Sequence, residues 1–421
     1  MKTWLTYLAA AAMGLAFELV LKDTAGFVPF ITFMSEIVMK LGVFIVFPLV
    51  FVSMMSGTAS LTRKSGRTGF TWLSTIFWAL FTSAAFACIG VLVFRIFPAA
   101  FPMTSTVPES AEQAAVIYQE LSATTMQRLQ NANPLSINAF VNLIRSSDCL
   151  LPVLFAALVF GYAIRPTSEV IRPAYITINS LSEVMFRLAR QVAKLLWIAI
   201  FFISGTWYDK LWTDGTIFES WRFVVMFVIA GFGTLLILLP LIYAIATGFK
   251  RNPYRQIIRL LSAGCAAFFS TNYLFSQTPL YTDCRINLGI QKSVVSTTLP
   301  IHSIITKGGS AMVSTLCTCS LVYALNGSMP NVVQTFTIAI ACTLASFLCC
   351  LHAGGEVVFA SAFALGLLKV NVSGAEFAII GLLPLLNGVA TMFDIFLAGL
   401  GCSFTATNLK ADCYIRNRDN V

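Results

Sequence analysis

Charged residues are scarce in this chain. They make up 11% of its 421 residues, whereas soluble domains carry roughly 25%. Hydrophobic residues make up 57%, and the mean hydropathy is +0.82. This composition excludes an ordinary soluble domain. It predicts an all-α polytopic membrane protein, because a spanning helix needs about 20 apolar residues and the sequence contains many such stretches.

Histidine is nearly absent, with two in the whole sequence. The chain has no H-E-x-x-H motif and no Ser/His/Asp set, so nothing in it indicates an enzyme. Most of the 11 cysteines lie inside apolar stretches, where cysteine acts as a small hydrophobic residue. Cys317 and Cys319 have no second ligand pair at zinc spacing. The sequence therefore predicts no metal site and no cofactor.

The net charge of +9 could suggest nucleic-acid binding, but the distribution of the basic residues argues against it. They gather in alternate loops, and the intervening loops are acidic or mixed, as expected when the basic loops face the cytoplasm. This alternation predicts an integral protein of the cytoplasmic (inner) membrane, with both termini in the cytoplasm. The basic groups are Arg63, Lys64 and Arg67; Arg165, Arg172, Arg187, Arg190 and Lys194; Lys250, Arg251, Arg255 and Arg259; and Lys410, Arg416 and Arg418.

Long apolar runs predict six ordinary helices in the first part of the chain. The first run contains Glu18 and lacks a small-residue cleavage site, so we expect a retained helix rather than a signal peptide. The second contains Pro48 and is long enough to tilt or kink. A polar loop is expected at 102–131. The predicted helices cover residues 4–21, 30–61, 70–97, 135–164, 187–203 and 223–249.

Two apolar segments in the second half are interrupted. Ser276-Gln277-Thr278-Pro279 divides residues 258–290, and His352-Ala353-Gly354-Gly355-Glu356 divides residues 333–368. Each arm is too short to span a bilayer, so re-entrant hairpins fit better than loops between short spanning helices. Longer helices are predicted after each hairpin, at 294–325 and 377–405. Paired broken segments of this kind indicate the binding site of a transporter.

Several motifs, in this order, resemble the dicarboxylate/amino acid:cation symporter family, which has the glutamate-transporter fold. Pro48-Leu49-Val50-Phe51 and Gly57-Thr58-Ala59-Ser60-Leu61 are similar to the second-helix motifs of that family. The resemblance covers nearly the whole chain. Further similar stretches are Leu80-Phe81-Thr82-Ser83-Ala84, Asn133-Pro134, Leu151-Pro152-Val153, Asn252-Pro253 and Thr298-Leu299-Pro300.

The resemblance implies eight transmembrane helices plus two re-entrant helical hairpins in a single transporter chain, residues 1–421, that forms a homotrimer. Residues of about 4–61 and 135–215 would form the scaffold. A sliding transport domain would comprise about 70–98 and 223–409. The implied function is secondary active transport of a small organic solute, an amino acid or a carboxylate, across a lipid bilayer.

In that family the substrate lies between the two hairpin tips. The serine-rich first tip aligns with Tyr273-Leu274-Phe275, so most of its hydroxyl groups are missing here. For Ser276 and Thr278, helix termination explains the residue type as well as ligand contact does. The substrate-binding residues implied by the resemblance are Ser276, Gln277, Thr278, Ser310, Gly354, Gly355, Thr391 and Asp394.

The chain departs from the family at its sodium motif, Asn-Met-Asp-Gly-Thr in the seventh helix. The sequence here is Thr306-Lys307-Gly308-Gly309-Ser310, so a glycine replaces the anionic ligand and a lysine replaces the methionine. The classic sodium sites are therefore predicted to be lost, which favours proton-coupled or uncoupled transport. The residues implied in ion coupling, or in replacing the ion sites, are Thr82, Ser83, Thr306, Lys307, Gly308, Glu356 and His352.

The eighth helix also departs from the family, which carries an arginine there for a substrate carboxylate. A gapless alignment places Thr391 at that position, and no arginine lies between Arg285 and Arg416. Arginine binds carboxylates bidentately, so its absence predicts a neutral substrate. The same alignment places Gly388 and Gly399 at two aspartates of the family and leaves Asp394 as the only acid in the span.

Lys307 lies within an apolar segment, where an ammonium group costs at least ~2.5–3.5 kcal/mol. It needs a partner or a water-filled cavity, and Glu356 is the first candidate partner, with Asp394 the alternative. We hypothesise that the ammonium group substitutes for a bound cation. His352 is either a helix-end residue or a proton carrier. The alternative function is a non-transporting membrane sensor or receptor that keeps the transporter fold.

Overall fold

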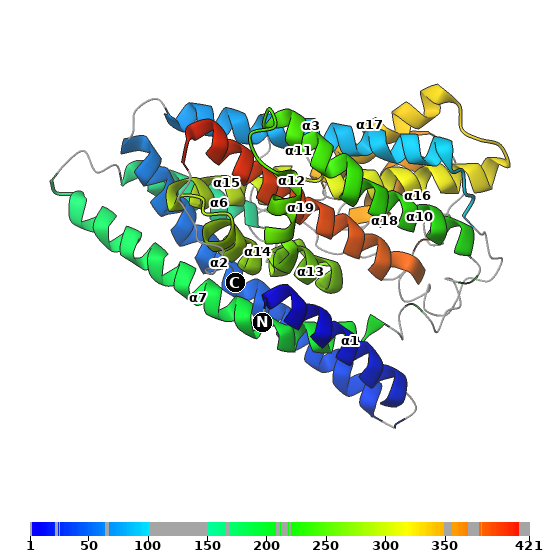
Figure 1. The fold of residues 1–421 in the computed structure, drawn as a ribbon, viewed down its shortest axis with the longest axis horizontal. Helices are drawn as coiled ribbons and strands as arrows, with labels where there is room; N and C mark the ends of the chain where they lie inside the picture. The colour runs from blue at the N-terminus through cyan, green and yellow to red at the C-terminus, as the bar shows by residue number, and fades with distance from the viewer. Residues whose placement is uncertain are drawn as a thin grey trace.

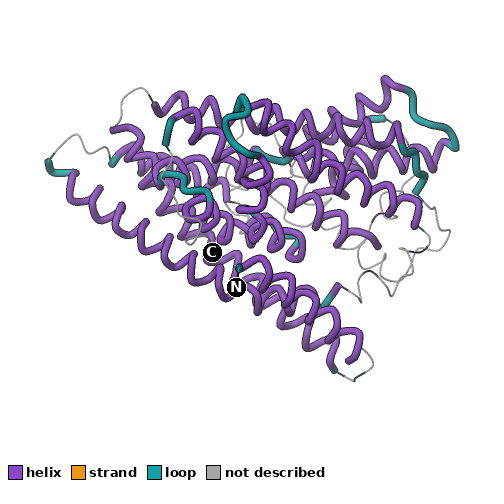
Figure 2. The backbone as a smooth tube through the Cα atoms, in the orientation of Figure 1, coloured by secondary structure: helices purple, strands orange, loops and turns teal. Residues whose placement is uncertain are grey.

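The computed structural model describes residues 2–21, 26–63, 67–101, 150–164, 169–207, 220–348, 356–368 and 381–411, together with 24, 211, 218 and 379. All elements in this part of the chain are helices (Figure 2). Six helical stretches in the described residues are long and apolar enough to cross a membrane, and one of them, Lys292–Asn326, contains a break. The all-α polytopic fold is thus confirmed, whereas the count of eight spanning helices stays a prediction.

The first three helices are close to those predicted. They are α1 (Thr3–Leu21), α2 (Phe27–Arg63) and α3 (Arg67–Ile96). With 37 residues, α2 is about 55 Å long and exceeds the ~30 Å hydrocarbon core of a bilayer. It must therefore tilt or extend beyond the membrane, as its length in the sequence predicted.

Helix α6 (Leu150–Ala163) is the described part of the fourth predicted helix, and residues 102–149 lie outside the described residues. Helix α7 (Arg172–Ser204) begins well before the predicted start at residue 187. Pro173 in its first turn suits a helix start. The sixth predicted helix is formed by α10 (Trp221–Gly233), a π-helical turn (Thr234–Leu238) and α11 (Leu239–Ala246).

The first hairpin consists of α13 (Leu261–Ser270) and α14 (Tyr273–Thr282), which follow the short α12 (Pro253–Arg259). Ten residues rise only about 15 Å, so neither arm can span a bilayer. The predicted position of the break, residues 276–279, is wrong. The chain turns at Thr271, which is left-handed (φ 52°), and the Asn272 Oδ1 atom caps α14 by accepting from the Leu274 and Phe275 amides at 2.9 and 3.2 Å.

The seventh predicted helix, 294–325, is also corrected, because the structure divides it into two. Helix α15 (Lys292–Ile305) ends at Thr306, which is extended (φ −96°, ψ 94°), and α16 (Gly308–Asn326) begins after Lys307. Two glycines at the start of α16 lower the helix propensity at this point. The break leaves backbone groups without helical partners in the middle of the protein.

The predicted arms of the second hairpin are helical, as α17 (Val332–Leu348) and α18 (Glu356–Leu367), but the predicted tip lies outside the described residues, so the hairpin itself stays a prediction. The last helix, α19 (Leu383–Leu409), begins later than the predicted 377 and ends at Leu409.

Two groups of helices pack together (Figure 1). Helix α7 contacts α1 and α2, and α2 also contacts α6; α1, α2 and α7 lie along one side of the molecule. In the second group α19 contacts α13, α15 and α16, and α16 also contacts α3 and both arms of the second hairpin. Contacts of α2 with α14 and α15 join the groups. The division of the chain into a scaffold and a sliding transport domain stays a prediction.

Candidate substrate and ion site

The break between α15 and α16 places Lys307 inside the protein, with a side chain that is 2% exposed. The Lys307 Nζ atom lies 2.6 Å from Oε1 of Glu356, whose side chain is 6% exposed. Glu356 is the first residue of α18, where a carboxylate is favoured by the helix dipole. The ion pair expected from the burial of both charges is therefore present, and it joins the helix break to the second hairpin.

Asp394 of α19 binds the beginning of α16. Its Oδ1 atom accepts hydrogen bonds from the backbone amides of Gly309, at 2.7 Å, and Ser310, at 3.4 Å. Lys307, at the cap position of α16, makes no side-chain capping bond. A carboxylate from another helix thus supplies the acceptor that a capping residue usually provides, at the end where negative charge is favoured.

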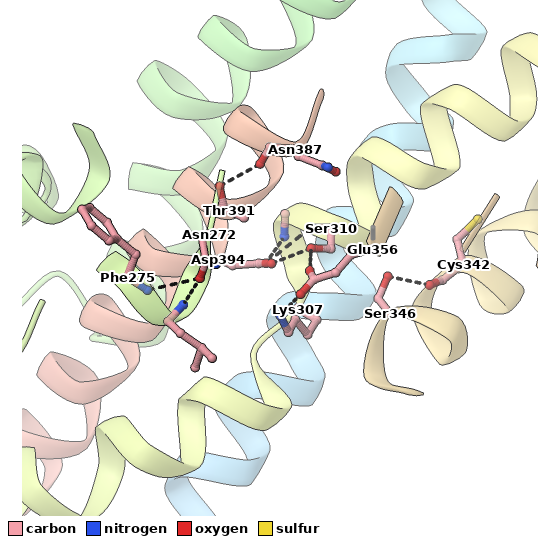
Figure 3. A network of polar contacts seen from close by, with 12 residues as sticks. Asn272, Phe275, Lys307, Ser310, Cys342, Ser346, Glu356, Asn387, Thr391 and Asp394 are labelled. Atoms are coloured by element: carbon pink, nitrogen blue, oxygen red, sulfur yellow. Dashed lines mark hydrogen bonds and ion pairs between the residues drawn. The ribbon is translucent and has the colours of Figure 1, made fainter. Parts of the chain in front are cut away.

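Ser310 connects the two carboxylates. Its Oγ atom lies 2.7 Å from Oε2 of Glu356 and 2.6 Å from Oδ2 of Asp394. Figure 3 shows the resulting chain, in which the side chains of Lys307, Glu356, Ser310 and Asp394 point toward one another. Three separate segments of the sequence are therefore joined by one buried polar network.

Tyr273 of the first hairpin completes the surroundings of Lys307. The ammonium nitrogen lies 4.9 Å from the centroid of the tyrosine ring, within the range of a cation–π contact. The tyrosine hydroxyl is buried and has no hydrogen-bond partner among the described residues. Both hairpins, the helix break and α19 thus each contribute a side chain to this site.

Gly309 lets α16 and α19 approach closely enough for this network. A Cβ atom at Gly309 would lie 2.6 Å from Cβ of Phe393 and 3.0 Å from the amide nitrogen of Asp394, and it would also meet the Ala390 carbonyl oxygen. Such distances are far below van der Waals contact, and the obstacles are mostly backbone atoms.

We therefore expect Gly309→Ala to lower the free energy of unfolding by about 1–3 kcal/mol, the usual cost of overpacking. A thermal-unfolding measurement on the purified protein checks this. Gly69→Ala is the matched control, since a Cβ atom there would have no neighbour within 4 Å. Equal unfolding temperatures for the two variants would contradict the packing argument.

Two of the predicted residues, Thr82 and Ser83, lie on α3, and the hydroxyl group of one of them already has a hydrogen-bond partner. The Thr82 hydroxyl donates to the Trp78 carbonyl at 2.7 Å. The Ser83 hydroxyl is buried without a hydrogen-bond partner in the described part of the chain. Gly308 packs against α3, since a Cβ atom there would lie 3.3 Å from the Thr82 carbonyl oxygen. Thr306 is buried, and its Oγ1 atom lies 2.7 Å from Nδ1 of His302.

The predicted residues of the first hairpin divide into two kinds. Ser276 lies inside α14, and its Oγ atom donates to the Asn272 carbonyl, four residues earlier, at 3.1 Å; the helix continues past it, so the helix-stop interpretation of this serine is wrong. Gln277 and Thr278 are buried in α14, and their side-chain polar atoms have no hydrogen-bond partner among the residues described.

Thr391 has a structural contact with the first hairpin, because its hydroxyl lies 3.0 Å from the Ala267 carbonyl and 2.7 Å from that of Asn387. Its expected contact with substrate stays a prediction. His352, Gly354 and Gly355 lie outside the described residues.

The sequence did not identify Asp283 as important. This buried carboxylate accepts from the Ser262 hydroxyl at 2.6 Å, the Ala263 amide at 3.0 Å and the Asn287 side chain at 2.8 Å. It thereby ties the end of α14 to the beginning of α13. The spacing of Asp283 and Asn287 was visible in the sequence, but the other two partners lie 21 and 20 residues away and could not be assigned.

Comparison with known proteins gives a consistent result. Residues 3–407 match the profile of the Sodium:dicarboxylate symporter family. The chain is 24% identical to the "Serine/threonine transporter SstT" of Streptococcus thermophilus (strain CNRZ 1066), over 74% of this chain and 73% of that protein. It is 26% identical to the protein of the same name from Bifidobacterium adolescentis, over 65% of this chain and 58% of that protein.

Proposed function

This chain belongs to the Sodium:dicarboxylate symporter family, and we propose that it is a secondary active transporter of a small neutral amino acid. The similar proteins named as serine/threonine transporters make serine and threonine the first candidates. The absence of arginine between Arg285 and Arg416 supports a substrate without a side-chain carboxylate.

The observation that carries the proposal is the buried pair of Lys307 and Glu356. It occupies the helix break that aligns with the sodium motif of the family. A fixed ammonium group there supplies the positive charge that a bound cation would otherwise bring, so transport would be coupled to protons or uncoupled rather than driven by sodium. Thr82, Ser83, Thr306, Gly308 and His352 would surround this site.

The substrate would lie between the two hairpins, close to Ser310 and Asp394. The side-chain polar groups of Gln277 and Thr278 have no hydrogen-bond partner in the part of the chain that the structure describes, which supports a role for the first hairpin in holding water or solute. The remaining predicted contacts are Ser276, Gly354, Gly355 and Thr391.

The proposed assembly is a homotrimer in the cytoplasmic membrane with both termini in the cytoplasm. Residues of about 4–61 and 135–215 would form the fixed scaffold, and residues of about 70–98 and 223–409 would slide with the substrate. The two groups of packed helices support this division.

The test is uptake of labelled serine, threonine and alanine by purified protein in liposomes. We expect uptake above that of protein-free liposomes, and faster uptake with an inward proton gradient if protons are coupled. Binding is measured separately from the rise in melting temperature that a ligand causes by mass action. Binding without uptake would replace the proposal by the alternative, a membrane sensor or receptor that keeps the fold.

A further inference from the structure

The hydroxyl group of Ser310 has too few hydrogens for the contacts it makes. Its Oγ atom lies 2.6 Å from one carboxylate oxygen and 2.7 Å from another, on Asp394 and Glu356. Both are full hydrogen-bond distances for an O–H donor. A serine hydroxyl carries one hydrogen and can donate only one such bond, so the second contact requires a hydrogen on the carboxyl group.

The other donors to these carboxylates among the described residues bind different oxygen atoms. The Lys307 ammonium binds the far oxygen of Glu356, and the Gly309 and Ser310 amides bind the far oxygen of Asp394. The two near oxygens, Oε2 and Oδ2, have Ser310 Oγ as their shared partner in the described structure. Two ionised oxygens facing one hydroxyl group at these distances would leave one contact repulsive.

We propose that Glu356 and Asp394 share one proton through the hydroxyl group of Ser310, and that this is the proton site of the transporter. In one arrangement Asp394 carries the proton and donates to Ser310, which donates to Glu356. In the other, Glu356 carries it and Ser310 donates to Asp394. The two interconvert when one hydrogen moves from the acid to Ser310 Oγ and the serine hydrogen moves to the other carboxylate, with no net change.

The surroundings are consistent with a single proton. Lys307 and two ionised carboxylates would sum to one negative charge, whereas one added proton makes the three side chains neutral together, which suits burial. Lys307 is the one ionisable side chain shown in contact with either carboxylate in the described ranges. Among the side chains that the structure describes, the charged ones on α3 and α15, which pack against this region, are the half-buried Arg95 and Lys292. The other buried ionisable side chains on elements from α13 to α19 are Cys265 of α13, Tyr273 and Tyr281 of α14, Asp283 and Cys284 directly after it, His302 of α15, Cys317 and Cys319 of α16, Cys342 of α17 and Cys402 of α19.

The test uses infrared spectroscopy on the purified full-length protein at neutral pH. A protonated carboxyl group gives a C=O stretch that is separate from that of carboxylates and shifts in heavy water. We expect one such band, lost in both Glu356→Gln and Asp394→Asn. Each amide supplies an N–H to Ser310 in place of the acid hydrogen, so the remaining carboxyl group can ionise beside Lys307.

A shared proton predicts loss of the band in both single variants. If instead one acid were neutral because of burial alone, the band would disappear only in the variant that removes that acid and would remain in the other. Asp283→Asn is the matched control, because it removes another buried carboxyl group outside the network, and the band should persist. Ser310→Thr keeps the hydroxyl group and should also keep the band.

No band in the wild type, its persistence in either amide variant, or its loss in Asp283→Asn would overturn the inference. So would an amide variant that does not fold, since the amide offers the same pattern of donors and acceptors. Folding is checked by circular dichroism.

The role of this proton in transport rests on the proposed function, and a second measurement separates the two. Uptake driven by a proton gradient should lose its pH dependence in Glu356→Gln and Asp394→Asn. If the wild-type protein shows the band but no uptake, the proposed function is wrong and the shared proton stands. If it shows uptake but no band, the shared proton is wrong and the proposed function stands.

Discussion

Lys307→Met is expected to lower the free energy of unfolding by about 3–5 kcal/mol, the usual cost of leaving one member of a buried ion pair without its partner. Glu356 is 5% exposed and would lose the ammonium group that compensates its carboxylate in a low-dielectric interior. The measurement is chemical or thermal unfolding of the purified protein in detergent. Methionine preserves most of the side-chain length, so the change removes charge more than volume.

Two further variants make this prediction specific. The double variant Lys307→Met/Glu356→Gln removes both charges and should recover most of the lost stability. Lys40→Met removes one member of the exposed pair with Glu36, whose side chains are 80% and 61% exposed, and should change little. If Lys307→Met unfolds like the wild type, or if the double variant is less stable than the single one, the burial argument fails.

Acidic amino acids are expected to bind at least about 100-fold more weakly than their neutral amides. The side-chain carboxylate would be buried without a partner, which costs several kcal/mol, and each 1.4 kcal/mol corresponds to a tenfold change in affinity. Lys307 is already engaged by Glu356, and Asp394 adds negative charge beside it. No arginine that could clamp a carboxylate lies between Arg285 and Arg416.

The cleanest comparison uses ligands that differ only in charge. We would compare glutamine with glutamate, and asparagine with aspartate. Each is measured as an inhibitor of serine uptake and by the rise in melting temperature that it causes. The neutral member of each pair should be the better ligand. Equal or tighter binding of glutamate would show that the site has a carboxylate clamp that the described residues do not reveal.

Composition and helix length predicted much of the fold. Long apolar runs identified α1, α2, α3 and α19 to within a few residues, because a membrane span needs a run of fixed length. The short arms of α13 and α14 agree with the first predicted hairpin, whereas α17 has 17 residues, which is near the length of a span, and the second hairpin stays a prediction. The need of buried Lys307 for a counter-charge led to Glu356.

Local details were predicted less well. Tyr273, Leu274 and Phe275 prolong an apolar run beyond the turn, so hydrophobicity placed the tip of the first hairpin too late. The better signal was Asn272, an N-cap residue type directly before α14. The break before Gly308-Gly309 was hidden in the same way by the apolar residues on both sides.

The network at Ser310 could not be predicted from sequence. Ser310 and Asp394 are 84 positions apart, and Ser310 and Glu356 are 46 apart. Their approach depends on the packing of α16 against α18 and α19, which a single sequence does not encode in any short pattern. The residue types in the sequence indicate the candidate site residues, whereas the tertiary packing determines which of them are in contact.

The most direct test of the central claim, that Lys307 replaces the coupling cation, is the sodium dependence of uptake. Wild-type protein in liposomes takes up labelled serine at fixed pH and membrane potential, with sodium replaced by choline on both sides. The account predicts the same initial rate with and without sodium. A steep, saturable rise of the rate with sodium concentration would contradict it.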